Sequence, residues 1–318
     1  MRRVVFFGSA AALLTLGFVF ACSGDDPAAT QTGADSSTPG VDSSSMPGVD
    51  SSVPAEDAGG VDSSTAADAD ADAGPPPYTP AVLGARMVLW LEGDSFKEID
   101  GGVMWPDKSA TGNDAFQDAS ARMPFLIEAG AEGGINGHSV VRFAGHEYLR
   151  IGDSPTLQWA ADDFALYVVM RHENGATALP AYGIVYAKWT DTGPQFPGLF
   201  MWAGYPGSTG YETRLDVTQA IGSDSGLNDG TMRLVGTRRS GMSYELRVGG
   251  NQVSLLTDAG IEDPAAFNAA GLPAFIGGRE AQIQQLQGDI AEIVAVKGTL
   301  TDLEQTTLEG YLAKKFGL

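Results

Sequence analysis

Residues 244–256 read YELRVGGNQVSLL, and this stretch decides the fold class. Two strand-like runs, 244–248 and 251–256, flank Gly249 and Gly250. A two-residue turn between such runs needs a positive φ at its central positions, which glycine adopts readily. The stretch therefore predicts a tight hairpin of two antiparallel strands.

Short apolar runs of the same kind recur on both sides of this hairpin. No long amphipathic stretch separates them, which excludes alternating β-α units and favours an antiparallel sandwich or barrel. The sequence therefore predicts an all-β fold over residues 81–318. The other runs are RMVLWL (86–91), VVRF (140–143), YLRI (148–151), FALYVVM (164–170) and residues 232–236, 274–276 and 290–296.

One helix is expected, at the C-terminus. Thr301 and Glu304 have the spacing of a capping box, in which each side chain bonds the backbone N–H of the other residue. An apolar stripe and two lysines follow, and the lysines suit the negative end of the helix dipole. We expect this helix to pack on the sandwich. The stripe is Leu308, Tyr311, Leu312 and Phe316, and the lysines are Lys314 and Lys315.

Composition excludes several classes of protein. The 318 residues hold 19 basic and 40 acidic side chains, a net charge of −21, which argues against a nucleic-acid partner. A single cysteine rules out a disulfide framework, and three histidines leave little room for a histidine-rich metal site. The 42 glycines suit a β-rich chain with many turns.

The first 22 residues have the layout of an export signal. Arg2 and Arg3 precede an uncharged apolar run at 4–21. The end of this run, Val19-Phe20-Ala21-Cys22, resembles the lipobox of bacterial lipoproteins. That resemblance implies cleavage after residue 21, lipidation of Cys22 and a lipid-anchored protein of the outer membrane, facing the periplasm or the cell surface. An uncleaved anchor, or ordinary cleavage that leaves a stray thiol, is the alternative.

Residues 23–80 form a low-complexity segment. They carry eleven acidic and no basic residues, and the sequence Gly-Ala/Val-Asp-Ser-Ser occurs four times. This composition cannot bury enough apolar surface to offset chain entropy, so it predicts a disordered tether over 22–80. Calcium binding by the aspartates of residues 68–72 is a less favoured alternative. The domain at 81–318 has 17 basic and 29 acidic residues, a net charge of −12.

Three blocks of the domain carry a family resemblance. They are Trp105-x-Asp107-x-Ser109 with Gly112-Asn113-Asp114-Ala115; Gly134-Ile135-Asn136-Gly137-x-Ser139-Val140-Val141-Arg142-Phe143; and Gly288-Asp289-Ile290-Ala291-Glu292-Ile293 with Leu300-Thr301 and Gly310-Tyr311-Leu312-Ala313. Together they resemble the LamG-like jelly-roll domains of the concanavalin A-like lectin/glucanase superfamily. The resemblance implies two packed antiparallel sheets over about residues 83–318. Members bind sugars, proteins or calcium, or cleave polysaccharides, so the fold does not choose a function.

No catalytic signature is found. Glucanases of this superfamily carry Glu-x-Asp-x-Glu or Glu-x-Asp-x-x-Glu on one strand, and the nearest match, 92–98, is one residue too long and holds a glycine. Asp289 and Glu292 are expected on opposite faces of a flat strand. A carboxylate buried at Glu292 needs a partner, for which Arg142 is the candidate. We therefore expect a protein without catalytic residues.

Calcium is the one cofactor that the sequence suggests. Asp107, Asn113 and Asp114 fall in one expected loop, and oxygen ligands on loops suit calcium. The favoured alternative is that the three side chains cap turns, which Asp and Asn do routinely.

An aromatic cluster is the best indication of binding. Eight aromatic residues lie between 182 and 211, interrupted by glycine and proline. Trp189, Tyr205 and Tyr211 adjoin turn residues, so we expect their rings to be exposed and to bind a ligand. Phe200 and Trp202 are expected in the sandwich core.

These features together predict a membrane-anchored surface protein that presents a binding module for neutral glycans. The alternative is a protein-contact, adhesion or scaffold module, and a glycoside hydrolase is the third interpretation. Expected partners are the membrane, through the lipid, and a polysaccharide or a cell-surface protein.

Overall fold

The computed structural model describes residues 78–318, except 160–161, 174–182, 191–196, 205–209, 217, 225, 262 and 281–283. Predictions on residues 1–77, including Cys22 and the tether, lie outside the described residues. No helix within the described part of the chain is long and apolar enough to cross a membrane.

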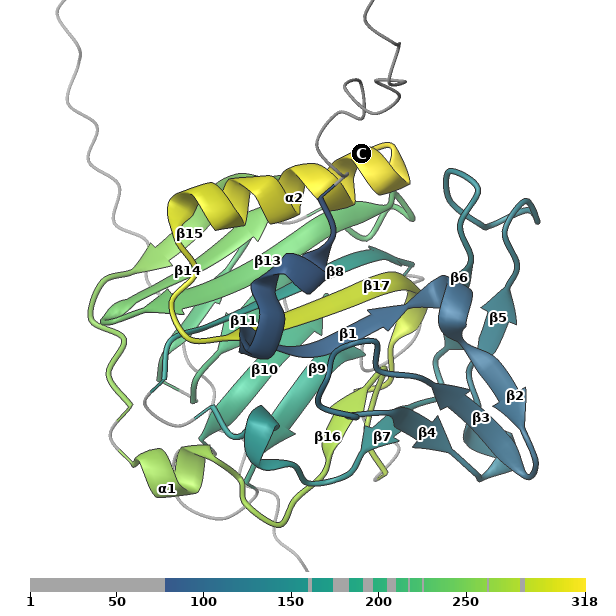
Figure 1. Ribbon diagram of the computed structural model, residues 1–318, viewed down its shortest axis with the longest axis horizontal. Coiled ribbons are helices and arrows are strands. Elements are labelled where there is room, and N and C mark those ends of the chain that lie inside the picture. Colours follow the sequence, from purple (N-terminus) through teal and green to yellow (C-terminus); the bar gives the residue numbers. More distant parts are fainter. Residues whose placement is uncertain are drawn as a thin grey trace, which may run out of the picture. The chain divides into compact units, whose positions relative to one another are not determined.

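Two antiparallel sheets make up the domain (Figure 1). Sheet A has the order β15-β14-β13-β8-β17-β6-β5, and β1 also pairs with β17. Its strands are β1 (Met87–Glu92), β5 (Phe125–Ile127), β6 (Val140–Ala144), β8 (Phe164–His172), β13 (Arg233–Ser240), β14 (Ser243–Val248), β15 (Asn251–Leu256) and β17 (Gln287–Lys297).

Sheet B has nine strands in the order β12-β11-β10-β9-β16-β7-β4-β3-β2. With sheet A it confirms the predicted all-β class. Its strands are β2 (Lys97–Ile99), β3 (Gly102–Trp105), β4 (Ala115–Gln117), β7 (Leu149–Ile151), β9 (Gly183–Trp189), β10 (Gly198–Ala203), β11 (Tyr211–Arg214), β12 (Ala220–Gly222) and β16 (Ala274–Ile276).

The predicted hairpin is confirmed as β14–β15. Val248 pairs with Asn251, and the two turn glycines have φ of 59° and 77°. Both values lie in the left-handed region that disfavours side chains with a Cβ. The turn therefore depends on Gly249 and Gly250.

The core lies between the two sheets. Alternate strand residues point inward, so one face of each strand is buried against the other sheet. Large members of this core include Trp105, Trp159, Phe164, Tyr186 and Tyr244, all with at most 1% of their surface exposed.

Helix α2 (Asp302–Phe316) covers the outer face of sheet A, and Figure 1 shows it lying along that face. The predicted capping box is present: the Thr301 N–H donates to Glu304 Oε2 at 2.9 Å, and the Glu304 N–H donates to Thr301 Oγ1 at 3.2 Å. Leu308, Leu312 and Phe316 pack on apolar residues of the sheet. A second apolar cluster therefore lies outside the sandwich.

A β-bulge in β17 corrects one expectation. The register of β17 against β8 shifts between Ile290 and Glu292. The extra residue restores an even spacing, so Asp289 and Glu292 both point to the outer face of sheet A, and the expectation of opposite faces is wrong. Arg142 consequently bonds Asp289, at 2.7 and 2.8 Å, and is not the partner of Glu292.

Candidate functional site

One row of side chains crosses the outer face of sheet B from β11 to β2. Each member lies directly opposite the next in the antiparallel register, so the side chains share a face. We call this set the outer row. It consists of Arg214, Phe200, Ala187, Phe275, Arg150, Phe116, Met104 and Lys97.

Aromatic rings connect along one part of the outer row. The ring of Phe200 lies 5.0 Å from that of Trp202 and 5.0 Å from that of Trp189, centroid to centroid. Phe275 lies 6.0 Å from Trp189 and 6.1 Å from Tyr148. These distances fall within the range of favourable aromatic pairs. The outer face of β9, β10 and β16 therefore carries a continuous series of rings.

Arginine side chains lie over several of these rings. The guanidinium carbon of Arg214 is 4.8 Å from the ring centroid of Trp202, and that of Arg150 is 5.0 Å from Phe116. Each of the two guanidiniums also bonds a carboxylate, Glu212 for Arg214 and Glu280 for Arg150. Their charge is thus balanced locally.

The carboxyl group of Glu212 has a raised pKa. Burial is the larger effect, and the hydrogen bond from Arg214 only partly offsets it. This end of the outer row is consequently poor in solvent.

Exposure differs between the two ends of the outer row, taken together with the tryptophan rings that pack beside it. Trp189, Phe200 and Trp202 are 8%, 7% and 6% exposed. Phe275, Phe116 and Met104 are only half-buried, and the side chain of Arg150 is 40% exposed. We call these four residues, on β16, β4, β3 and β7, the open half of the row. A ligand that approaches sheet B meets this half first.

The three predicted ligand-binding residues have different outcomes. Trp189 lies on the outer face of sheet B and outside the inter-sheet core, but the expected exposure of its ring is wrong. Tyr211 is 1% exposed and belongs to the inter-sheet core, so its expected exposure is wrong too. It lies in β11 rather than in a turn, and its inward position follows from strand alternation. Tyr205 lies outside the described residues.

The expectation that Phe200 and Trp202 fill the sandwich core is also wrong, because both lie in the outer cluster. Their neighbours Leu199, Met201 and Ala203 take the inward positions of β10. All six residues of β10 are buried, so no alternation of buried and exposed residues distinguishes its inward face from its outward face.

Gly198 allows the close approach that places Trp189. A Cβ at Gly198 would lie 2.4 Å from the Cα of Trp189, which faces it across the β9–β10 pair. Any larger residue would push these two strands apart. The position of the rings therefore depends on this glycine.

The loop with Asp107, Asn113 and Asp114 brings the three predicted residues together. The carboxylate of Asp107 accepts from the backbone N–H groups of Trp90, Ser109 and Asn113, and the Asp114 carboxylate accepts from the Asp107 N–H. The Asp107 and Asp114 side chains thus cap turns in the structure, whereas the Asn113 amide donates to Val88 O and Thr156 Oγ1 and ties the loop to the rest of the domain. Within the described residues, no three His, Asp or Glu side chains are grouped in a way that could hold a metal.

A buried carboxylate pair lies beneath the end of α2. Glu92 and Glu292 face each other across β1 and β17, and Lys315 Nζ donates to them at 2.7 and 2.6 Å. The indole N–H of Trp90 donates to Glu292 at 2.8 Å. Because Lys315 lies on α2, its two ion pairs hold the end of the helix on sheet A, over the fully buried Glu292 side chain.

The two carboxyl groups have pKa values shifted in opposite directions. Burial raises the pKa of Glu292 more than Lys315 lowers it. Burial would also raise the pKa of Glu92, but hydrogen bonds from Lys108 and Lys315 outweigh it and lower that pKa. Sequence reasoning missed this pair because the bulge in β17 decides the face on which Glu292 lies.

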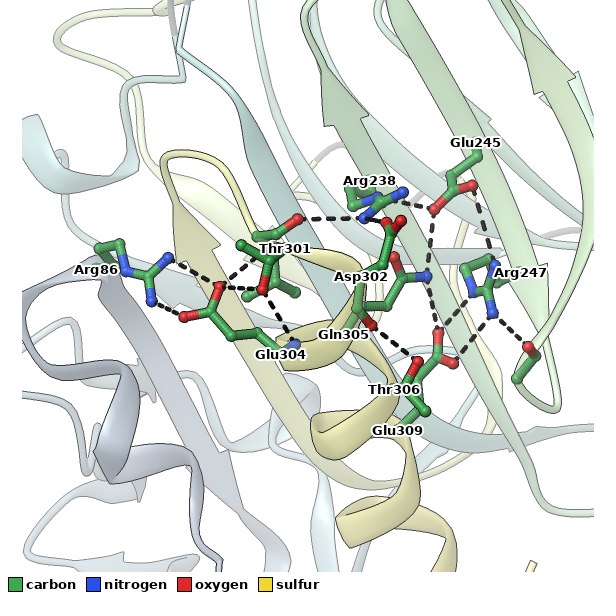
Figure 2. A network of polar contacts seen from close by, with 12 residues as sticks. Arg86, Arg238, Glu245, Arg247, Thr301, Asp302, Glu304, Gln305, Thr306 and Glu309 are labelled. Carbon is green, nitrogen blue, oxygen red and sulfur yellow. Dashed lines mark hydrogen bonds and ion pairs between the residues drawn. The ribbon is translucent and has the colours of Figure 1, made fainter.

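Further ion pairs fix the first half of α2 (Figure 2). Arg238 bonds Asp302 and Glu245, each at 2.9 Å, and Arg247 bonds Glu309 at 2.7 Å. Every one of these charged groups faces an opposite charge. Helix α2 therefore covers the outer face of sheet A, and its ion pairs with Arg238 and Arg247 attach it to the sheet.

Comparison with known proteins leaves the family open. No family model and no curated protein matches the chain. Among solved structures, Trypanosoma rangeli sialidase matches with a TM-score of 0.47 and 14% identity, over 75% of this chain and 36% of that one. The binding domain of Paraclostridial Mosquitocidal Protein 1 matches with a TM-score of 0.49 and 11% identity, over 73% of this chain and 53% of that one.

Domain 4 of a GH43 extracellular arabinanase from Geobacillus stearothermophilus, solved with arabinotriose, matches with a TM-score of 0.41 and 13% identity. The match covers 70% of this chain and 98% of that domain. The chain thus spans about a third to a half of the sialidase and mosquitocidal-protein chains. At these scores and identities the likeness assigns neither a ligand nor an activity.

Proposed function

We propose that this protein is a lipid-anchored surface protein whose LamG-like jelly-roll domain binds a neutral glycan on the open half of the outer row. The observation that carries the proposal is the cross-strand register that brings Phe275, Arg150 and Phe116 into one line. Apolar rings beside a few hydrogen-bonding groups are typical of ligand sites.

The chemistry of the open half suits sugar rings. Phe275 and Phe116 are only half-buried, and a pyranose can stack its C–H face on the ring surface that Arg150, which lies over Phe116, leaves open. Arg150 and Glu280 lie beside them and offer a donor and an acceptor for hydroxyl groups. The two rings lie on strands separated by one other strand, so they are about 10 Å apart. A glycan that runs across the strands would contact both rings.

Charge supports a neutral ligand. The domain has a net charge of −12, which repels acidic polysaccharides. The outer row holds two arginines. Arg150 pairs with Glu280, and Arg214 pairs with Glu212, so the charge of each guanidinium is already balanced. We therefore expect binding that depends little on salt, because stacking is not a charge effect.

Anchoring is the second part of the proposal and depends on Cys22. The lipobox-like end of the apolar run supports lipidation there, and two or three acyl chains would hold the protein on a membrane stably. Cys22→Ala should release the protein from the membrane fraction or block its processing. Mass spectrometry that finds an unmodified Cys22 in the mature protein would contradict the lipid anchor.

Binding is tested by pull-down of the full chain with insoluble neutral polysaccharides. Phe116→Ala and Phe275→Ala should each weaken binding, whereas Leu303→Ala, a 77% exposed residue on α2, should not. Tyr205→Ala belongs in the same series, because its ligand-binding role is still a prediction. Wild-type protein that binds no neutral glycan would overturn the proposal. If Phe116→Ala and Phe275→Ala both bind the polysaccharide as strongly as the wild type, the binding site lies elsewhere.

Catalysis has little support from the described residues. Carboxylates lie in pairs at Glu92 with Glu292 and at Glu245 with Glu309, and α2 packs against both pairs. Protein contact is the stronger alternative, because a separate cleft in the domain favours it.

A further inference from the structure

A cleft of about 720 Å³ opens at the end of the sandwich where the edge strands β2 and β5 lie. Figure 1 shows these two strands at the same end of the molecule, each last in its own sheet. Phe96, Val103, Met123 and Leu126 line the cleft, and all four belong to the inter-sheet core or pack against it. The cleft therefore reaches from solvent to the interior between the sheets.

Both strands beside the cleft have a free edge. Within the described residues, β2 pairs only with β3, and β5 pairs only with β6. An exposed apolar residue lies at the opening: Phe125 is 46% exposed. A free edge with exposed apolar residues is a template for another extended chain.

Two of the three charged residues that line the cleft are carboxylates, Glu98 and Glu128, and the third is Lys97. Glu98 lies directly opposite Val103, so it points to the inner face, and Glu128 follows β5. Across the described part of the chain, neither carboxylate has a hydrogen-bond or ion-pair partner. Lys97 lies opposite Met104 and so points to the outer row, away from the interior. The cleft thus combines an apolar floor with unpaired negative charge.

We propose that this cleft binds an extended polypeptide segment of a partner protein, in which apolar side chains alternate with lysine or arginine. The segment would add to the free edge of β5 with its cationic side chains pointing into the cleft, towards Glu98 and Glu128, and with its apolar side chains on the opposite face, beside Phe125. The aliphatic stem of a lysine suits the apolar wall while its ammonium stays near the carboxylates. A volume of about 720 Å³ is in the range of pockets that bury a few side chains.

The tether of this chain does not fit the same chemistry. Residues 23–80 carry eleven acidic and no basic residues, so they would be repelled by Glu98 and Glu128. The net charge of −12 on residues 81–318 likewise attracts a basic partner and disfavours a second copy. A basic, partly apolar segment of another protein is the occupant that the charges favour.

The test uses fluorescence anisotropy of the full chain with a fluorescein-labelled peptide, Gly-Ser-Val-Lys-Val-Lys-Val-Ser-Gly. One control peptide has Glu in place of Lys, and a second has Ser in place of Val. The wild type should bind the first peptide, and each control peptide should bind at least about tenfold more weakly, as expected for loss of a charge pair or of a buried apolar group. Raising the salt concentration should weaken the first complex.

The double variant Glu98→Gln/Glu128→Gln should lose about tenfold in affinity for the lysine peptide, because both expected partners of the cations are removed. Its matched control, Glu280→Gln, removes a carboxylate on the outer face of sheet B and should leave the affinity unchanged. Thermal unfolding of each variant checks that the fold is kept.

The proposal is overturned if the wild type does not bind the lysine peptide, if the Lys and Glu peptides bind equally, or if the double variant keeps wild-type affinity. Pull-down with neutral polysaccharides, run on the same variants, separates this proposal from the glycan site. Phe116→Ala and Phe275→Ala should keep peptide binding, and the Glu98/Glu128 double variant should keep glycan binding.

Discussion

The outer faces of the two sheets are both rich in apolar residues but differ in how far they are covered. Both carry large apolar residues where a simple sandwich would expose polar ones. On sheet A, α2 covers them, and Asp302, Glu304 and Glu309 of the helix each pair with an arginine (Figure 2). On sheet B, the rings of β9 and β10 are buried, while the row from β16 to β3 stays partly open. The apolar outer face is therefore covered by helix α2 in sheet A and is left partly open in sheet B.

The largest difference between the two faces should appear on truncation of a phenylalanine in each. Phe316, on the side of α2 that faces sheet A, has 2% of its surface exposed, and Phe116 is half-buried in the open half of the outer row. Phe316→Ala should cost about 3–5 kcal/mol of unfolding free energy, as for a core phenylalanine. Phe116→Ala should cost about 1 kcal/mol. Denaturant unfolding of the full chain measures both.

Equal losses of unfolding free energy in Phe316→Ala and Phe116→Ala would contradict the difference between the two outer faces. A loss of about 3 kcal/mol or more at Phe116 would mean that the open half is as tightly covered as the face beneath α2. Its role as a platform for a ligand would then fail.

The second test removes the cation that bridges the buried carboxylates. Lys315→Met leaves Glu292 buried without its ion-pair partner, and breaking a buried pair in this way costs about 3–5 kcal/mol. The matched control is Lys314→Met, since Lys314 is the exposed neighbour on the same helix. On sheet B, Arg150→Met should cost no more than about 1 kcal/mol, because its pair with Glu280 is exposed. A small loss for Lys315→Met would show that the Lys315 bridge contributes little to holding α2 on sheet A.

Local features of the sequence predicted part of this comparison. The Gly249-Gly250 turn and the Thr301–Glu304 capping box each depend on residues that are near one another in the chain, so both were readable from spacing. The all-β class followed from the same short range of information.

Features that depend on pairing between strands far apart in the chain could not be predicted from the sequence. The bulge in β17 decides the face of Glu292, and it arises from the register against β8. Phe275, Arg150 and Phe116 are the central residues of three-residue strands, and only the order of sheet B makes them one row. Lys188 is fully buried beside Trp189, where its Nζ donates to Asp153 at 2.7 Å. Nothing in the sequence near Lys188 indicates that partner.

A smaller effect should follow from the pH dependence of the α2 cap. The hydrogen bond from Arg86, together with the Thr301 N–H, lowers the pKa of Glu304 to about 2. A carboxyl group whose pKa is lower in the folded state adds stability above its unfolded pKa, and this stability is lost as the pH falls toward 2. Because Glu304 is largely solvated, the contribution should be only about 0.5–1 kcal/mol.

Glu304→Gln should therefore lower the melting temperature at pH 6 and match the wild type near pH 2. On the other face, Glu280→Gln should change the melting temperature little at pH 6, because it removes an exposed ion pair. The same deficit of Glu304→Gln at both pH values would show that the side chain contributes by its shape or packing and not by its charge.

The smallest expected effect concerns calcium at the loop beside β3 and β4. The Asp107 carboxylate already accepts from the N–H groups of Trp90, Ser109 and Asn113, so its oxygens stabilise the turn without a metal. On this interpretation, millimolar calcium and a chelator should give the same melting temperature. Asp107→Ala should still destabilise the protein by about 1–3 kcal/mol, because buried N–H donors lose their acceptor. A melting temperature that rises with calcium in the wild type but not in Asp107→Ala would instead support the calcium site, since a ligand that binds only the folded state stabilises it by mass action.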